Sequence, residues 1–248
     1  MTSLPTASSS TSLDGAKVLV VGGSSGIAVE IARQAVAAGA QVTLAGRDLD
    51  RTRTATEPLG PAVTAATVDL GDEATIQALA EDLGEVDHVV NLASNPAIGA
   101  VQDLERSAVV AAFDAKVIGP LLLAKHLAPQ MRPTGSLLLF SGIVAWRPAP
   151  ELSVMATTNG AVSFLAAALA VELAPIRVNA LSPGIVDSGA WDGMGTDDKE
   201  AHFAATAAAN PARRVGQPAD IASAALLALT NPFITGTTLH VDGGGRLS

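Results

Sequence analysis

Val21-Gly22-Gly23-Ser24-Ser25-Gly26-Ile27-Ala28 is the stretch that decides the fold. It joins the apolar run 17–21 to the segment 26–38, which has the periodicity of a helix. Glycines allow a tight turn and let the backbone approach a pyrophosphate, while the helix N-terminus offers unpaired N–H groups to an anion. A plain strand–helix turn can carry the same residues. However, a second strand candidate, 41–45, follows at the right distance, so we predict a dinucleotide-binding turn.

The rest of the chain alternates short β-branched runs with longer helical segments. The strand candidates are 17–21, 41–45, 63–68, 86–91, 136–141, 176–181 and 237–241. The helix candidates are 26–38, 73–82, 104–112, 113–130, 152–174, 197–208 and 217–229. Apolar strands separated by helices indicate a parallel sheet covered on both faces. We predict a single α/β domain with a Rossmann-type, doubly wound, seven-stranded sheet over 14–248, a flexible tail over 1–13 and a mobile substrate loop near 187–205.

Composition excludes several classes of protein. The chain has 248 residues, no cysteine and a net charge of -9. Disulfides and thiolate metal sites are therefore ruled out, and nucleic acid is an unfavourable partner. The mean hydropathy is +0.37, but polar residues interrupt every apolar run before the roughly 20 residues of a membrane helix. The Ser- and Thr-rich start has no basic or apolar leader, so we expect a cytoplasmic protein without a membrane span.

The glycine turn resembles that of the short-chain dehydrogenase/reductase family, usually Thr-Gly-x-x-x-Gly-x-Gly, with Val21 for the Thr and Ala28 for the last Gly. Four further segments resemble family motifs in order and spacing, namely 68–70, 91–94, 176–184 and 236–244. The resemblance spans about residues 14–245. It implies that the cofactor is held by Gly22, Ser24, Ser25, Gly26, Ile27, Asp69, Leu70, Asn91, Ala93, Pro183, Gly184 and Val186.

The choice of cofactor depends on the end of the second strand. An acidic side chain there would bind the ribose 2′-hydroxyl and repel a 2′-phosphate. The matching position is Gly46, and Arg47 follows it. A guanidinium can bind a 2′-phosphate through two donors and stack on adenine. We therefore favour NADP(H) over NAD(H), the alternative being a solvated arginine beside Asp48 and Asp50.

The residues that the family uses for proton transfer are missing. Met155 stands where the family has Tyr, Asn159 where it has Lys, and Gly142, next to Ser141, where it has Ser. Lys116 stands where the family has Asn. Methionine cannot donate a proton, and the chain contains no tyrosine.

The family's Asn and Lys are therefore exchanged, as Lys116 and Asn159. A lysine half-buried beside the cofactor has a lowered pKa and can act as acid or base. Candidate catalytic residues are Lys116, Ser141 and Asn159. The alternatives are that Lys116 pairs with a carboxylate or extends to solvent, and that backbone groups satisfy Ser141.

The family's substrate pocket corresponds here to Trp146, Met155, Trp191, Met194 and Phe203, which suggests a largely apolar ligand. The four histidines lack convincing metal-ligand spacing, so we predict no metal site.

The first hypothesis is an atypical NADP(H)-dependent oxidoreductase acting on a small, largely apolar carbonyl, imine or enone. A non-redox isomerase or lyase is the second, and an inactive nucleotide sensor or partner subunit is the third. The Ala- and Leu-rich segments 113–130 and 152–174 match the helices that family members pair between subunits, so we expect a homotetramer or homodimer.

Overall fold

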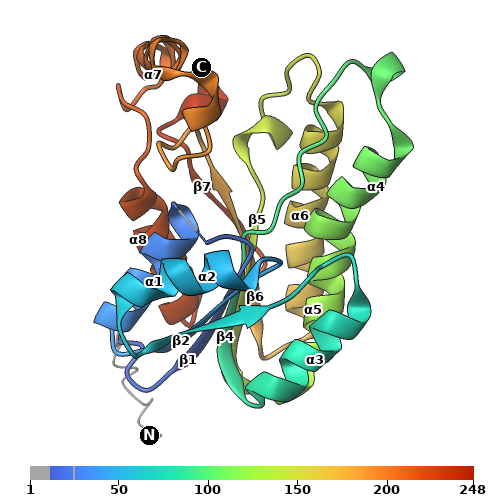
Figure 1. The fold of residues 1–248 in the computed structure, drawn as a ribbon, viewed down its shortest axis with the longest axis vertical. Helices are drawn as coiled ribbons and strands as arrows, with labels where there is room; N and C mark the ends of the chain where they lie inside the picture. Colours follow the sequence, from blue (N-terminus) through green and yellow to red (C-terminus); the bar gives the residue numbers. More distant parts are fainter. Residues whose placement is uncertain (1–11, 25) are drawn as a thin grey trace, which may run out of the picture.

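The computed structural model describes residues 12–24 and 26–248, and its centre is one parallel sheet (Figure 1). The strand order is β3-β2-β1-β4-β5-β6-β7. The strands are β1 (Lys17–Val21), β2 (Gln41–Gly46), β3 (Val63–Thr67), β4 (Val86–Asn91), β5 (Met131–Phe140), β6 (Arg177–Pro183) and β7 (Thr238–Val241). This confirms the predicted doubly wound, seven-stranded sheet. The order reverses between β1 and β4, and such a reversal opens a crevice at the carboxyl ends of the strands.

Helices cover both faces of the sheet (Figure 1). One layer holds α1 (Ile27–Ala37), α2 (Leu49–Thr56) and α8 (Pro218–Thr230). The other holds α3 (Glu73–Leu83), α4 (Arg106–Phe113), α5 (Gly119–Leu127) and α6 (Ser153–Glu172). A further helix, α7 (Thr196–Ala209), lies beyond the carboxyl ends of the strands.

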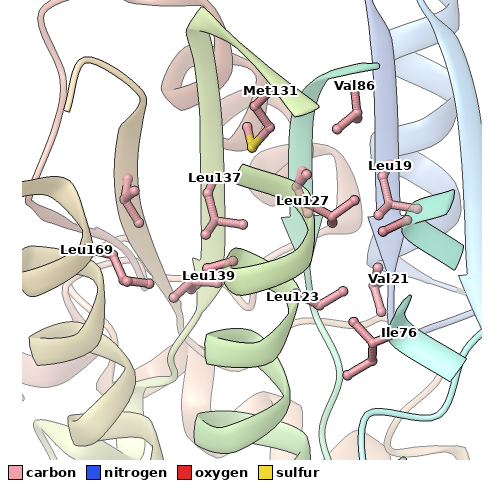
Figure 2. Close-up of a cluster of buried hydrophobic side chains, with 14 of the residues drawn as sticks. Leu19, Val21, Ile76, Val86, Leu123, Leu127, Met131, Leu137, Leu139 and Leu169 are labelled. Atoms are coloured by element: carbon pink, nitrogen blue, oxygen red, sulfur yellow. The ribbon is translucent and has the colours of Figure 1, made fainter. Parts of the chain in front are cut away.

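The two apolar cores follow from the alternation of side chains along the strands. On β1, Leu19 and Val21 pack with Leu123, Leu127 and other residues of the α3–α5–α6 layer (Figure 2). The neighbouring residues Val18 and Val20 face the other way and pack against α1 and α8. Burial on both faces explains why the strands are apolar throughout and not alternating.

Helix α2 is absent from the sequence prediction. Its buried residues are Thr52 and Thr56, so it has no aliphatic stripe that periodicity could detect. The carboxylate of Asp48 caps it by accepting a hydrogen bond from the backbone N–H of Arg51 at 3.0 Å. Strand β5 begins at Met131, five residues before the predicted start. The prediction missed this part of the strand because Arg132, Pro133 and Thr134 are exposed and polar or without an apolar pattern.

The start of the domain also differs from the prediction. Leu13, assigned to the tail, is 2% exposed and packs in the α1–α8 core, and its backbone N–H donates to the Ala38 carbonyl at 3.0 Å. Residues 1–11 of the predicted tail lie outside the described residues. Much of the predicted loop 187–205 is helical, since α7 begins at Thr196.

Two helical stretches, Arg106–Gln130 and Ser153–Glu172, are long and apolar enough to cross a membrane by length and composition alone. The sequence prediction, which counted uninterrupted apolar residues, missed this property. In the structure both stretches pack on the sheet, where Leu123, Val162 and Leu169 are buried. Some of their apolar side chains therefore form part of the core, and the rest of each stretch remains exposed.

Candidate functional site

A cavity of about 480 Å³ opens at the carboxyl ends of β1 to β4, where the strand order reverses. Six of the predicted cofactor residues line it, namely Gly22, Ser24, Arg47, Asp69, Leu70 and Ala93. Its other lining residues include Arg51 and Thr52 from α2, and Ala111, Asp114 and Ala115 from the end of α4 and the turn after it. The cavity thus joins segments that are up to about 90 residues apart in the sequence.

The glycine turn forms one wall of the cavity and admits no side chain at two positions. Gly22 has a φ of +96°, and a Cβ there would overlap the backbone of Ala93. Gly26 has a φ of +56°, and a Cβ there would overlap the Ser188 carbonyl. The turn leads directly into α1, whose first residue is Ile27. This gives the arrangement that binds a pyrophosphate at a helix N-terminus. Ser25 lies outside the described residues.

The end of β2 and the start of α2 form another part of the wall. Arg47 and Arg51 are exposed at its rim, and neither guanidinium has a carboxylate partner among the described residues. A Cβ at Gly46 would lie 3.1 Å from Thr52 Oγ1. Thr52 is 1% exposed, and its hydroxyl donates to the Asp48 carbonyl at 2.7 Å, which fixes it. An acidic side chain at Gly46 would therefore pack tightly against a buried, hydrogen-bonded threonine.

The remaining predicted cofactor residues that the structure describes do not line the cavity. Gly26 and Ile27 begin α1, while Asn91 ends β4 and accepts a hydrogen bond from the Ala93 backbone N–H at 3.3 Å. Pro183 ends β6, Gly184 packs tightly on Asp242, and the buried Val186 bridges to Gly216. They lie at the same edge of the sheet, beyond the carboxyl ends of β1, β4 and β6.

Lys116 sits in a π-helical turn, Asp114–Ile118, that the sequence prediction missed. Pro120 explains the turn, because it has no N–H to bond the Lys116 carbonyl and its ring clashes there. The Gly119 N–H instead bonds the Asp114 carbonyl, five residues back. Gly119 is required because a Cβ there would overlap Leu70 and Asp114. The dipeptide Gly119-Pro120 was the available sequence signal.

The Lys116 side chain points inward and is 6% exposed. Its Nζ donates a hydrogen bond to the Phe140 carbonyl oxygen at 2.8 Å, at the end of β5. Burial disfavours the ammonium and lowers the pKa of Lys116 to about 8. The side chain therefore neither extends to solvent nor pairs with a described carboxylate, which removes the two simple alternatives for it.

Ser141 and Asn159 meet beside Lys116, since Ser141 directly follows Phe140. The Ser141 hydroxyl donates to the Asn159 carbonyl at 2.7 Å, so it is committed to a backbone acceptor. A Cβ at Gly142 would lie 3.1 Å from Asn159 Nδ2, so the amide fills the space beside this residue. Asn159 Oδ1 is buried and has no hydrogen-bond partner among the described residues. The three predicted catalytic residues are thus gathered at the end of β5.

The predicted substrate residues lie on segments around the same edge. Trp146 contacts His240 edge-on at 4.8 Å between ring centroids, and Trp191 lies 4.7 Å from His202. Lys199 lies 5.3 Å from the Phe203 centroid and also pairs with Asp187 and Asp192. Met155 is half-buried on α6, and Met194 is exposed. His202 also contacts Phe203, so Trp191 and Phe203 belong to one cluster, and none of the five predicted substrate residues lines the cavity.

No group of three or more His, Cys, Asp or Glu side chains that could hold a metal ion occurs within residues 12–24 and 26–248. His88 is a structural residue, since its Nδ1 hydrogen-bonds the Ser136 hydroxyl at 2.9 Å inside the sheet.

Comparisons with known proteins match nearly the whole chain. A family model described as enoyl-(acyl carrier protein) reductase matches residues 21–245. A short-chain dehydrogenase/reductase of Stachybotrys chlorohalonatus is 30% identical, over 94% of this chain and 98% of its own length. A small-chain dehydrogenase solved in complex with NADPH is 34% identical with a TM-score of 0.80, over 95% of this chain and all of its own. An apo short-chain oxidoreductase of Pseudomonas aeruginosa, described as containing an atypical catalytic center, is 26% identical with a TM-score of 0.84, over 92% of this chain and 96% of its own.

Proposed function

The chain belongs to the short-chain dehydrogenase/reductase family, and we propose that it is an atypical NADP(H)-dependent member acting on a small, largely apolar carbonyl, imine or enone. In this proposal Lys116 takes the place of the missing phenol as the proton donor. Membership in the family makes the chain an oxidoreductase of this type. The cofactor preference, the substrate class and the proton donor are the proposed part.

The cavity at the carboxyl ends of β1 to β4 is the observation that carries the proposal. Its size and position suit a dinucleotide, and its glycine turn leaves room for a pyrophosphate. Arg47 and Arg51 offer two guanidiniums at the end of β2, where a 2′-phosphate would lie. A side chain at Gly46 would make a tight contact with Thr52, which disfavours the acidic residue that selects NAD(H) at this position.

When bound, the nicotinamide ring supplies or accepts a hydride. The chain's own residues then have to hold the substrate oxygen and move a proton to it. Lys116 Nζ is protonated at neutral pH, because its pKa of about 8 is still above 7, and this value makes it a stronger acid than a surface lysine. Asn159 Oδ1, on the helix beside Gly142, is an acceptor with no hydrogen-bond partner in the described part of the chain, and it suits a hydroxyl of ribose, water or substrate.

An enzyme that uses Lys116 in this way should depend on it strongly. A panel of ketones, enones and iminium compounds is screened with NADPH oxidation as the readout. We expect Lys116→Met to reduce turnover of the best substrate on the order of 10²-fold or more, with much less change in NADPH affinity. Lys17→Met, which removes an exposed lysine from β1, is the matched control and should be neutral.

Two outcomes of the screen would overturn parts of the proposal. Equal turnover by the wild type and Lys116→Met would remove the role of Lys116. NADPH binding without turnover of any substrate would favour a nucleotide sensor or an inactive partner subunit. The relative described as containing an atypical catalytic center supports testing this chain as an enzyme first.

Assembly into a homotetramer or homodimer is also part of the proposal. Helix α6 exposes Phe164 and Val171, which are 80% and 82% exposed, and the stretch through α5 exposes Ile118 and Leu121. Apolar surface of this kind on two long neighbouring helices is typical of a subunit interface. A monomeric mass by light scattering at micromolar concentration would contradict this, and Phe164→Glu should weaken the assembly.

A further inference from the structure

Residues 188–209, which we call the α7 segment, are anchored to the fold at both ends. Before the segment, the backbone N–H of Asp187 donates to the Gly216 carbonyl at 2.9 Å. After it, the backbone N–H of Ala212 donates to the Gly243 carbonyl at 3.0 Å. Between these anchors the segment carries α7 beyond the carboxyl ends of the strands (Figure 1).

Helix α7 packs weakly on the rest of the fold. None of its residues, all of which the structure describes, is buried. Its main contacts with other described elements are with the short helical turn Asp192–Met194, which belongs to the same segment. Gly189 and Gly195 bracket this turn, with φ values of +87° and +85°. A helix without a buried face opens at a low cost in free energy unless a specific interaction holds it.

Lys199 of α7 provides such an interaction. Its Nζ lies 2.8 Å from Asp187 Oδ1 and 2.7 Å from Asp192 Oδ1. Hydrogen bonds to Asp187 and then to Asp192 raise the pKa of Lys199, so the ammonium keeps its charge around neutral pH. The bond to Asp187 joins the α7 segment to its anchor, whereas the bond to Asp192 stays within the segment.

The start of the α7 segment touches the nucleotide site. A Cβ at Gly26 would overlap the Ser188 carbonyl, so this carbonyl lies directly against the residue before α1. Gly22 and Ser24 of the same turn line the cavity. A displacement that begins at Asp187 would therefore move Ser188 at the N-terminus of α1, where the pyrophosphate would bind.

We propose that Lys199 is a positioning residue whose ion pair with Asp187 latches the α7 segment against the glycine turn and so retains the bound nucleotide. This rests on the proposed function, because the ligand that is retained is the NADP(H) of that proposal. Lys199 is not among the described residues that line the cavity, so it acts through the position of the segment. The pair with Asp192 moves with the segment and contributes little to the latch.

The position of the α7 segment can be measured without nucleotide. The chain contains no cysteine, so Glu200→Cys on α7 and Arg106→Cys on α4 give two specific sites for spin labels. Figure 1 shows α7 and α4 on opposite sides of this end of the molecule. Pulsed EPR, with excess unlabelled chain to remove distances between subunits, should give one main distance. Asp187→Asn should add a population at longer distance, whereas the matched control Asp192→Asn should not.

Release of NADPH, followed by stopped-flow fluorescence, tests the role of the latch. Lys199 and Asp187 are 24% and 37% exposed, so their pair is a partly hydrated one. We expect Asp187→Asn and Lys199→Met each to speed release about fivefold, and Asp192→Asn less than about twofold. Lys199→Arg should keep slow release. The double exchange of Asp187→Lys with Lys199→Asp reverses the pair and should restore most of the retention, which a purely local packing role would not predict.

An unchanged distance distribution in Asp187→Asn would overturn the inference, and this result needs no nucleotide. An opened segment with unchanged NADPH release would overturn the link between the latch and retention. These outcomes are distinguishable from failure of the proposed function. If Asp187→Asn opens the segment in a chain that binds neither NADPH nor NADH, the latch is supported and the cofactor assignment is refuted.

Discussion

Strand β5 contacts a buried ionisable side chain at two places, its middle and its end, and the two side chains differ in their charge at neutral pH. In the middle of the strand, Ser136 is the register partner of His88 on β4, and their side chains hydrogen-bond at 2.9 Å. At the end of the strand, the Phe140 carbonyl holds Lys116 at 2.8 Å. Burial lowers both pKa values, that of His88 to about 4 and that of Lys116 to about 8.

At pH 7 these shifts have opposite consequences. His88 is neutral, so its burial carries no charge into the sheet and the site is purely structural. Lys116 still carries its charge for most of the time, and the fold tolerates this beside the cavity. A buried side chain that stays charged, as Lys116 does, is a candidate for function. A buried side chain that is neutral, as His88 is, can be explained by packing alone.

The largest expected effect concerns His88. Above pH 6.5 the side chain is neutral in both the folded and the unfolded chain. As the pH falls from 6.5 to about 4, the unfolded chain takes up a proton that the folded chain refuses, so the free energy of unfolding falls by about 3 kcal/mol. Urea unfolding of His88→Gln should lack this part of the pH dependence. If the free energy of unfolding varied with pH equally steeply in His88→Gln and in the wild type, the structural role given to His88 would be contradicted.

The next effect concerns the stability contribution of Lys116. Below pH 8 the ammonium is present in both states and is penalised in the folded one, and the penalty disappears as the pH rises to 10.5. Lys116→Met should therefore raise the free energy of unfolding at pH 7 by about 2 kcal/mol, after about 1 kcal/mol is subtracted for the lost hydrogen bond. The gain should vanish near pH 10.5. A variant less stable than the wild type at pH 7 would show that Lys116 is there for structure.

The smallest effect concerns Gly142, where the family has serine. Its φ of -179° strains no residue, but a Cβ would lie 3.1 Å from Asn159 Nδ2. We expect Gly142→Ser to destabilise the fold by about 1 kcal/mol, and to do so by much less in an Asn159→Ala background. Equal effects in both backgrounds would show that positions 142 and 159 are not coupled.

Much of the fold could be predicted from the sequence because its periodicity is strong. The apolar strands and the helices α1, α3, α6 and α8 are visible as patterns, and the glycine turn marks the switch point. Helix α2 was missed because threonines fill its buried positions. For the same reason Arg51 was not recognised as part of the cavity wall.

For the candidate catalytic site, the sequence predicted which residues come together but not the hydrogen bonds that they make. The resemblance placed Lys116, Ser141 and Asn159 together, and the structure gathers them at the end of β5. It could not show that Ser141 donates to a backbone carbonyl, or that Lys116 reaches Phe140. The Lys116 contact involves the π-helical turn, whose cause is a local conflict at Pro120 that hydrophobic patterns do not record.

The preference for NADPH over NADH is the measurement that tests the account most directly, because every other role depends on the nucleotide site. Isothermal titration should give an affinity for NADPH at least about tenfold higher than for NADH, equivalent to about 1.4 kcal/mol. Arg47→Ala should erase most of this difference, while Arg53→Ala, whose guanidinium pairs with Asp50, should leave it in place. Equal affinities of the wild-type chain for the two nucleotides would contradict the account.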